Sequence, residues 1–275
     1  MPPGPASKRI RGGWALEVVV LYGAFALYDW TRDQVQGDGV TAFRNAESII
    51  RWERLFGLYQ EHRIQGWFLD RGWFISFWNI YYGTIHFVAP VAALVWLYRR
   101  APVRYVRWRN TFLAMLALGL LGFWLYPLMP PRLMPARYGF VDTAAQYFNF
   151  GPQQPVVLGP GGTPIGAGAA SFGNLYAAMP SLHVGWSTWS VVAVLPTIRR
   201  PWVRLLLCCY PLCTVFAITV TGNHWLLDAV GGWIALAAAW SMAVGWERLR
   251  RGQRYRGAPS TSRTNGSKCS SGSVS

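Results

Sequence analysis

The chain has 275 residues, of which 52% are hydrophobic, 16% aromatic and only 13% charged, with a formal net charge of +15 at pH 7. Soluble domains usually carry about a quarter charged residues, so this composition argues against a soluble domain and favours a membrane protein. The basic residues fall in short clusters between apolar runs. That distribution is typical of membrane-protein loops and argues against nucleic-acid binding.

Six apolar segments are long enough, or nearly so, to cross about 30 Å of hydrocarbon at 1.5 Å per residue. They are predicted at residues 14–28, 73–98, 112–128, 183–196, 202–220 and 225–246. The first segment could instead be a signal peptide, because residues 24–26 resemble a small-residue cleavage site. Glu17 inside this segment and Asp29 just after it favour a retained helix.

Between the first two segments, apolar residues recur at roughly helical spacing among charges, which predicts a helix lying in the membrane interface. These residues are Phe43, Ala46, Ile49, Ile50, Leu55 and Phe56. Residues 151–173 are rich in Gly and Pro and are interpreted as a loop outside the membrane. The predicted fold is therefore an all-α integral membrane protein, a bundle of about six transmembrane helices plus an interfacial helix.

Three regions follow from this organisation: a basic N-terminus at 1–12, a membrane-embedded domain at 13–250 and a disordered tail at 251–275. Eighteen of the 26 Lys and Arg residues lie in the N-terminus, the second and fourth loops and the tail, and eight lie in the other loops. Because basic residues concentrate on the cytoplasmic side, both termini are predicted to be cytoplasmic and the long loops extracytoplasmic.

His224 and Asp228 form the sharpest pair of polar residues beside an apolar segment. Four residues apart on a helix, they would share one face, and the carboxylate would hold the imidazole in one tautomer as a nucleophile or base. Gly222-Asn223 just before them resembles a helix start, which would direct free backbone N–H groups at an anion. The alternative is a pair that only joins packed helices.

Two further polar clusters lie on the same predicted side of the membrane. Pro180-Ser181-Leu182-His183 enters the fourth segment, where Pro suits a first helical turn, Ser can cap the helix and His183 lies at the positive end of the dipole. Arg132 follows the third segment, and its guanidinium can hold two phosphate oxygens or snorkel to headgroups. Together these groups match phosphoryl transfer through a phosphohistidine.

These motifs resemble those of the type 2 phosphatidic acid phosphatase superfamily, within it the inositol-phosphorylceramide-synthase-like branch. Pro180-Ser181-Leu182-His183 is similar to the second motif, Pro-Ser-Gly-His, and His224-x3-Asp228 matches the third. Pro130-Pro131-Arg132-Leu133 resembles the first motif of the synthase-like branch. The resemblance implies His224 as nucleophile, Asp228 as its partner, His183 as acid and base, and Arg132 and Ser181 as phosphate ligands, without a metal or cofactor.

One departure concerns the third motif, which usually has Ser-Arg where this chain has Ala217-Ile218, so a second phosphate arginine is missing or comes from elsewhere. Asn79, Tyr82 and His86 share a helical face and are predicted either to line a headgroup pocket or to join packed helices. Glu53 and Glu61 are weaker candidates, and Glu53 is expected to pair with an arginine. A zinc site of His183, His224 and Asp228 is a disfavoured alternative.

The predicted function is transfer of a phosphoryl group or phospho-headgroup from a lipid substrate, to an alcohol as in an inositolphosphotransferase or to water. The alternatives are a lipid phosphate or pyrophosphate phosphatase and, outside enzymes, a lipid transporter or scaffold. The membrane and a lipid phosphate are the predicted partners, and nucleic acid is not. We expect a bacterial plasma-membrane protein whose active site faces the extracytoplasmic side.

Overall fold

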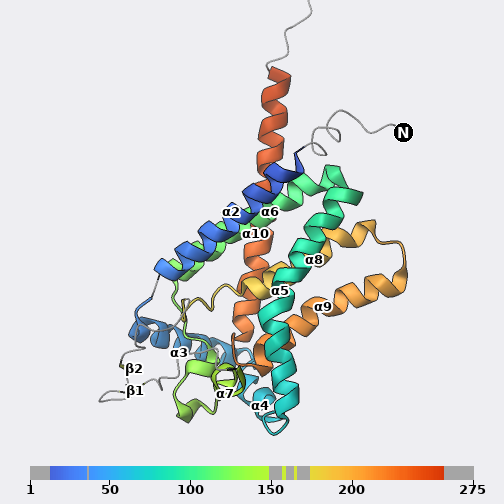
Figure 1. The fold of residues 1–275 in the computed structure, drawn as a ribbon. Helices are drawn as coiled ribbons and strands as arrows, with labels where there is room; N and C mark the ends of the chain where they lie inside the picture. Colours follow the sequence, from blue (N-terminus) through green and yellow to red (C-terminus); the bar gives the residue numbers. More distant parts are fainter. Residues whose placement is uncertain (1–12, 36, 149–156, 159–163, 166–173, 257–275) are drawn as a thin grey trace, which may run out of the picture.

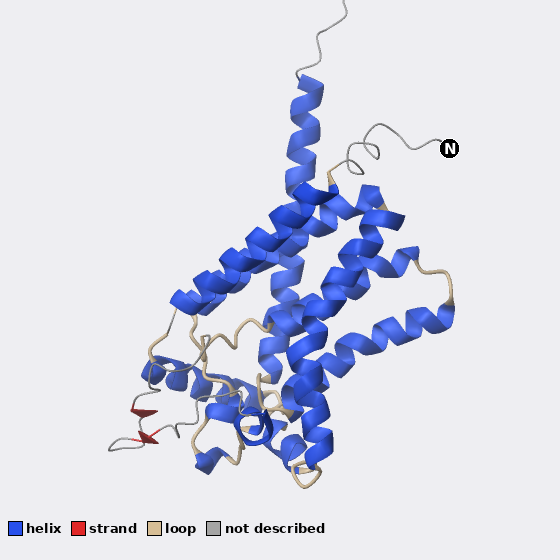
Figure 2. Ribbon diagram, in the orientation of Figure 1, coloured by secondary structure: helices blue, strands red, loops and turns tan. Residues whose placement is uncertain are grey.

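The computed structural model describes residues 13–35, 37–148, 157–158, 164–165 and 174–256, and helices make up most of these residues (Figure 2). A two-stranded antiparallel pair, β1 (Val157–Leu158) and β2 (Pro164–Ile165), lies among them. The predicted N-terminus at 1–12, most of the predicted 151–173 loop and the tail after residue 256 lie outside the described residues. The all-α class is confirmed.

Four described helices are long and apolar enough to cross a membrane: α5 (Gly72–Arg100), α6 (Pro102–Leu125), α9 (Pro201–Val220) and α10 (Leu226–Arg256). α5 alone, with 29 residues, rises by about 44 Å, more than the thickness of the hydrocarbon core. α6 and α9 each begin with a proline, which suits the first helical position. The chain is therefore an integral membrane protein.

The other two predicted segments also form helices, α2 (Trp14–Gln34) and α8 (Leu182–Val194), but these are not among the four. α8 has 13 residues and rises by roughly 20 Å, and the short helix η3 (Leu195–Thr197) follows it. α2 has 21 residues but includes Glu17, Asp29 and Arg32. The total of about six spans remains a prediction.

α8 lies at the centre of the bundle, where it packs against α5, α6, α9 and α10 (Figure 1). Ten of its 13 residues are buried. Trp189 of α8 is fully buried, and its indole Nε1 donates a hydrogen bond of 3.1 Å to the carbonyl oxygen of Trp108 in α6. This central position fixes the residues at the start of α8.

The predicted interfacial segment forms α3 (Gly39–Leu55) and the short helix α4 (Glu61–Gly66). Asp38 caps α3, since its carboxylate accepts a hydrogen bond of 2.9 Å from the backbone N–H of Thr41. Most of the apolar face of α3 packs on the protein, in one cluster with Met129 and Trp225. Leu55 and Phe56 instead remain exposed. The interfacial position of this helix stays a prediction.

Short helices gather beside α3 at one end of the bundle (Figure 1): η1 (Pro131–Leu133), η2 (Ala136–Tyr138) and α7 (Thr143–Phe148). The predicted third span extended to residue 128, but α6 ends at Leu125. Beyond it, the backbone N–H of Leu128 donates to the carbonyl oxygen of Tyr176 at 2.8 Å, and this bridge turns the chain toward η1.

The start of α2 and the end of α10 lie at the opposite end of the bundle from these short helices (Figure 1). Ion pairs join the long helices there. Arg109 of α6 binds Glu17 of α2 at 2.5 Å, and Arg107 of α6 binds Glu247 of α10 at 2.8 Å. Glu17 is therefore a structural partner of α6.

Candidate active site

His224 lies in the turn that joins α9 to α10, and its ring is held from one side. Nδ1 donates toward the carbonyl oxygen of Ala178 at 2.8 Å and toward the Asp228 carboxylate at 3.3 Å. With Nδ1 as the donor, Nε2 of a neutral imidazole carries the lone pair that can act as a nucleophile. The residue is only 3% exposed, so this tautomer is fixed by groups shielded from water.

The geometry of this pair differs from the predicted helical face. His224 precedes α10, which begins at Leu226, and the two side chains meet because Asp228 folds back over the helix start. Asp228 Oδ2 also accepts the backbone N–H of Trp225 at 3.0 Å. The predicted contact between His224 and Asp228 is therefore present, but it is made across a turn and not along one helix face.

The prediction of free N–H groups at Gly222-Asn223 is wrong. The amides of Asn223 and His224 both donate to the carbonyl oxygen of Ile218, which closes the turn after α9. The next amides are also occupied, since Leu226 donates to Glu61 and Leu227 donates to Glu53, each at 2.9 Å. The start of α10 is thus capped by the carboxyl groups of Glu53 and Glu61 and does not offer these amides to an anion.

Glu53 and Glu61 are therefore helix-capping residues, and the predicted pairing of Glu53 with an arginine is not found among the described ion pairs. Both are fully buried side by side. Burial and the neighbouring Glu61 carboxyl raise the pKa of Glu53 far above its usual range, so Glu53 is protonated at neutral pH. The sequence did contain a sign that Glu53 is buried, because Glu53 follows Ile49 by one helical turn on the apolar face of α3.

His183 lies in the first turn of α8, directly against His224. Its Nδ1 is 3.3 Å from Nε2 of His224, and Tyr82 of α5 stacks on its ring with 4.1 Å between the ring centroids. The first N–H groups of a helix have no partner within it, so His183 lies at the positive end of the α8 dipole as predicted. Pro180, however, precedes α8 and is not in its first turn.

A close crossing of α8 and α10 brings the two histidines together. A Cβ atom on Gly232 would lie 2.3 Å from the carbonyl oxygen of Ser181, so only glycine allows this approach. The backbone N–H of Ser181 donates to the carbonyl oxygen of Asp228 at 2.9 Å. The Ser181 hydroxyl is fully buried and has no hydrogen-bond partner among the described residues, so it does not cap α8. Ser181 does not line the cavity, and its role as a phosphate ligand stays a prediction.

Arg132, the third predicted cluster, lies in η1 and reaches the same cavity as His183 and His224. Its Nη1 atom donates to both oxygens of Asp142 at 3.1 and 3.0 Å, which orients the guanidinium. Its backbone N–H donates to the carbonyl oxygen of Gly222 at 2.8 Å. This hydrogen bond joins Arg132 to the turn that carries His224. Gly222 has φ of 68°, a conformation that favours glycine.

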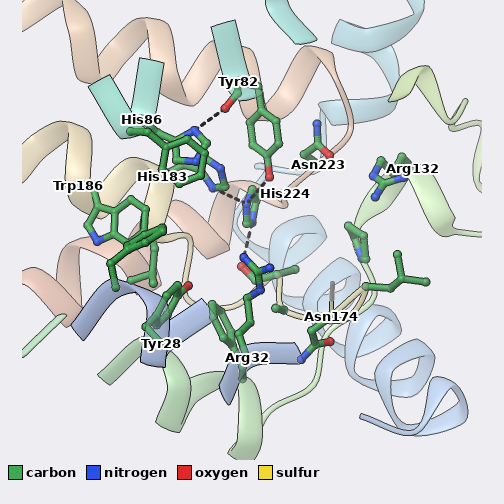
Figure 3. A pocket seen from close by; sticks show the side chains of 18 residues that line it. Tyr28, Arg32, Tyr82, His86, Arg132, Asn174, His183, Trp186, Asn223 and His224 are labelled. Atoms are coloured by element: carbon green, nitrogen blue, oxygen red, sulfur yellow. Dashed lines mark hydrogen bonds between the residues drawn. The ribbon is translucent and has the colours of Figure 1, made fainter. Parts of the chain in front are cut away.

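The two histidines and Arg132 line a cavity of about 240 Å³ (Figure 3). Arg32, near the end of α2, also lines it, and the sequence reasoning did not identify this residue. Its guanidinium pairs with Asp29 and Asp33 on the same helix, each at 2.9 Å. Figure 3 shows the side chain of Arg32 extending toward His224 from the side opposite Tyr82. The position of Arg32 just after an apolar segment was the one feature of the sequence that could have indicated a role in the site.

The three polar residues predicted to share one face of α5, Asn79, Tyr82 and His86, have different surroundings in the structure. Tyr82 and His86 line the cavity, and the Tyr82 hydroxyl lies 3.5 Å from His224 Nε2. Asn79 lies outside it and donates instead to Thr143 of α7 at 3.3 Å. The prediction of a headgroup pocket thus remains open for two residues, whereas Asn79 is placed in the interhelical network that was the alternative.

No curated protein and no solved structure matches the chain. The family model of the PAP2 superfamily matches residues 47–242, more than half of the chain. This range includes Arg132, His183 and His224, which line one cavity, and Asp228, which contacts His224. The chain therefore belongs to the PAP2 superfamily.

Proposed function

We propose that this protein is a membrane enzyme that transfers a phosphoryl group or phospho-headgroup from a lipid substrate through a phosphohistidine on His224. Membership of the PAP2 superfamily indicates phosphatase or phosphotransferase activity on lipid-like substrates. The observation that supports the finer proposal is the orientation of His224. Its Nδ1 is held by Ala178 and Asp228, and its Nε2 lies at the cavity beside His183.

The proposed reaction has two displacements at phosphorus. Nε2 of His224 attacks, the bond from phosphorus to the lipid oxygen breaks, and His183 gives its proton to the leaving oxygen. In the second step, His183 takes a proton from an alcohol or water, whose oxygen attacks phosphorus and releases His224. Asp228 stabilises the positive charge that develops on the His224 ring.

Developing negative charge on the phosphoryl oxygens needs positive groups in the cavity. We propose that Arg132 supplies one guanidinium and that Arg32 supplies the second, in place of the arginine that the wider superfamily has where this chain has the buried Ile218. The first amides of α8 add donors next to His183. These groups suit catalysis without a metal ion.

The acceptor distinguishes a transferase from a phosphatase. The Pro130-Pro131-Arg132-Leu133 motif and the replaced arginine favour the inositol-phosphorylceramide-synthase-like branch, and thus an alcohol acceptor. Transfer to an alcohol requires that the alcohol reach the phosphohistidine before water does. Tyr82, His86 and Asn223 line the cavity with polar groups that can bind a polyol.

The proposal is tested with purified protein in lipid nanodiscs and a panel of phosphatidate, lipid pyrophosphate and phosphatidylinositol. Each is assayed with and without inositol, and with EDTA. We expect EDTA-resistant turnover that is lost in His224→Ala and kept in His62→Ala, because His62 lies outside the cavity. With phosphatidate or the lipid pyrophosphate as donor, formation of an inositol phosphate ester from added inositol would assign a transferase, and phosphate release alone a phosphatase. Turnover that needs an added metal would contradict the mechanism.

A further inference from the structure

A second cavity, of about 380 Å³, lies beside the catalytic cavity, between α2 and α5. The two are adjacent, because they share four lining residues: Phe25, His86, Phe87 and Trp186. Apart from His86, the side chains around the second cavity are apolar or aromatic. A ligand that extended from His224 into this space would therefore leave a polar site and enter a hydrocarbon-like one.

The apolar space continues along both helices. A third cavity, of about 330 Å³, shares Val18 and Leu21 of α2 with the second, together with Leu94 and Val95 of α5, and it reaches Tyr98 and Arg99. From Phe87 to Tyr98 the rise of α5 is about 17 Å at 1.5 Å per residue. One leaflet takes up about half of the roughly 30 Å hydrocarbon core, so this length suits one lipid chain.

The edges of this space face outward from the protein. Val18 and Tyr22 on α2 and Val91 on α5 are 57%, 74% and 60% exposed, and α5 is one of the four helices long and apolar enough to cross a membrane. We call the space between these residues and Leu21, Leu94 and Val95 the α2–α5 groove. Because its edges are open to lipid, a chain can enter sideways without crossing the polar end of the bundle.

We propose that the α2–α5 groove binds one hydrocarbon chain of the lipid whose phosphate lies at His224. Along the three cavities, charged side chains occur at the two ends and not in the middle. Arg32 and Arg132 lie at the catalytic end, and Glu17 and Arg99 lie at the far end. This distribution matches an amphiphile with one anionic head. The assignment of the head to His224 rests on the proposed function, whereas the chain site rests on the groove.

The groove is tested by photo-crosslinking. A non-hydrolysable phosphonate analogue of dipalmitoyl phosphatidate, with a diazirine near the end of one chain, is added in trace amount to phosphatidylcholine nanodiscs that contain the protein. We expect crosslinks in residues 14–22 and 91–98, and excess unlabelled dipalmitoyl phosphonate should remove them. Crosslinks spread over the lipid-facing sides of α9 and α10, without competition, would overturn the groove.

Val91→Trp should lower the competed crosslinking roughly tenfold or more, because the larger ring overpacks the groove. Val192→Trp is the matched control, since Val192 is exposed on α8 and lies outside the lining of the groove. Equal loss in both variants would contradict the assignment. Competed crosslinking without turnover of any lipid phosphate would refute the proposed function and leave the groove, whereas turnover without competed crosslinking would refute the groove alone.

Discussion

Two guanidinium groups reach the cavity at His224, and each is oriented by a carboxylate before any substrate binds. Arg132 is held by Asp142, and Arg32 by Asp29 and Asp33. These pairs neutralise part of the positive charge, but guanidinium groups have five N–H donors each and can bind an oxyanion at the same time. The side chains are thus preorganised for an anion that carries several oxygens.

Arg32 gives the sharpest prediction at the level of single residues. Arg32→Ala should lower kcat/KM for the lipid phosphate by roughly a hundredfold, the scale of losing one donor to transition-state charge. Arg32→Lys should recover only part, because lysine keeps the charge but not the planar fork. Steady-state kinetics of both variants provide the check, and Arg44→Ala, an exposed arginine of α3, is the control. Wild-type kinetics for Arg32→Ala would leave Arg132 as the phosphate-binding arginine.

Three residues of the cavity could be predicted from short motifs, since Arg132, His183 and His224 each belong to one and do lie together. Arg32 could not, because it is one hundred residues from Arg132 in sequence and belongs to no motif. The donors at the start of α10 were also mispredicted. Glycine and asparagine before a helix indicate its start, but they do not reveal that Glu53 and Glu61 from distant segments occupy its amides.

At the level of helices, the crossing of α8 with α10 sets the distance between His183 and His224. Gly232→Ala should separate these helices, because the added methyl would meet the Ser181 carbonyl oxygen at 2.3 Å. We expect a loss of about 1–3 kcal/mol in stability from overpacking, together with a fall in kcat. Thermal unfolding in detergent and turnover measure the two effects.

Gly245→Ala is the matched control on the same helix. No atom lies within 4 Å of the position where its Cβ would be, so this substitution should leave turnover unchanged and stability equal or slightly higher. If Gly232→Ala behaved like Gly245→Ala, the close crossing would not be what positions the histidines.

Helix type was predictable because long apolar runs have few alternatives in a membrane. The role of α3 was not, since an amphipathic pattern shows one apolar face but not whether lipid or protein covers it. Here most of that face packs into a cluster of buried protein side chains that includes Met129 and Trp225. The short α8 was likewise hard to place, because its burial by four neighbouring helices is a property of the packed bundle.

For the whole molecule, the distribution of charge and the position of the cavity predict an orientation. The start of α2 and the end of α10 lie at one end, beside Arg107 and Arg109, and the short helices around Arg132 lie at the other (Figure 1). Basic residues favour the cytoplasm. We therefore propose that the cavity opens toward the extracytoplasmic side.

Cysteine labelling of intact cells tests this orientation in a variant without the native cysteines. A cysteine at exposed Asp70, near the α4 end, should react with an impermeant thiol reagent, and one at exposed Arg200, between α8 and α9, should not. Lysed cells should label both, which shows that each site is accessible. The reverse pattern in intact cells would place the active site in the cytoplasm.

The most direct test of the account is to trap the phosphate on His224. Protein is mixed with a turned-over lipid carrying labelled phosphorus, denatured within one turnover at alkaline pH, where a phosphoramidate bond survives, and digested for mass spectrometry. We predict labelled phosphorus on the peptide that contains His224, its absence from His224→Ala and its retention in His62→Ala. Turnover without a labelled peptide, together with wild-type activity of His224→Ala, would contradict the phosphohistidine mechanism.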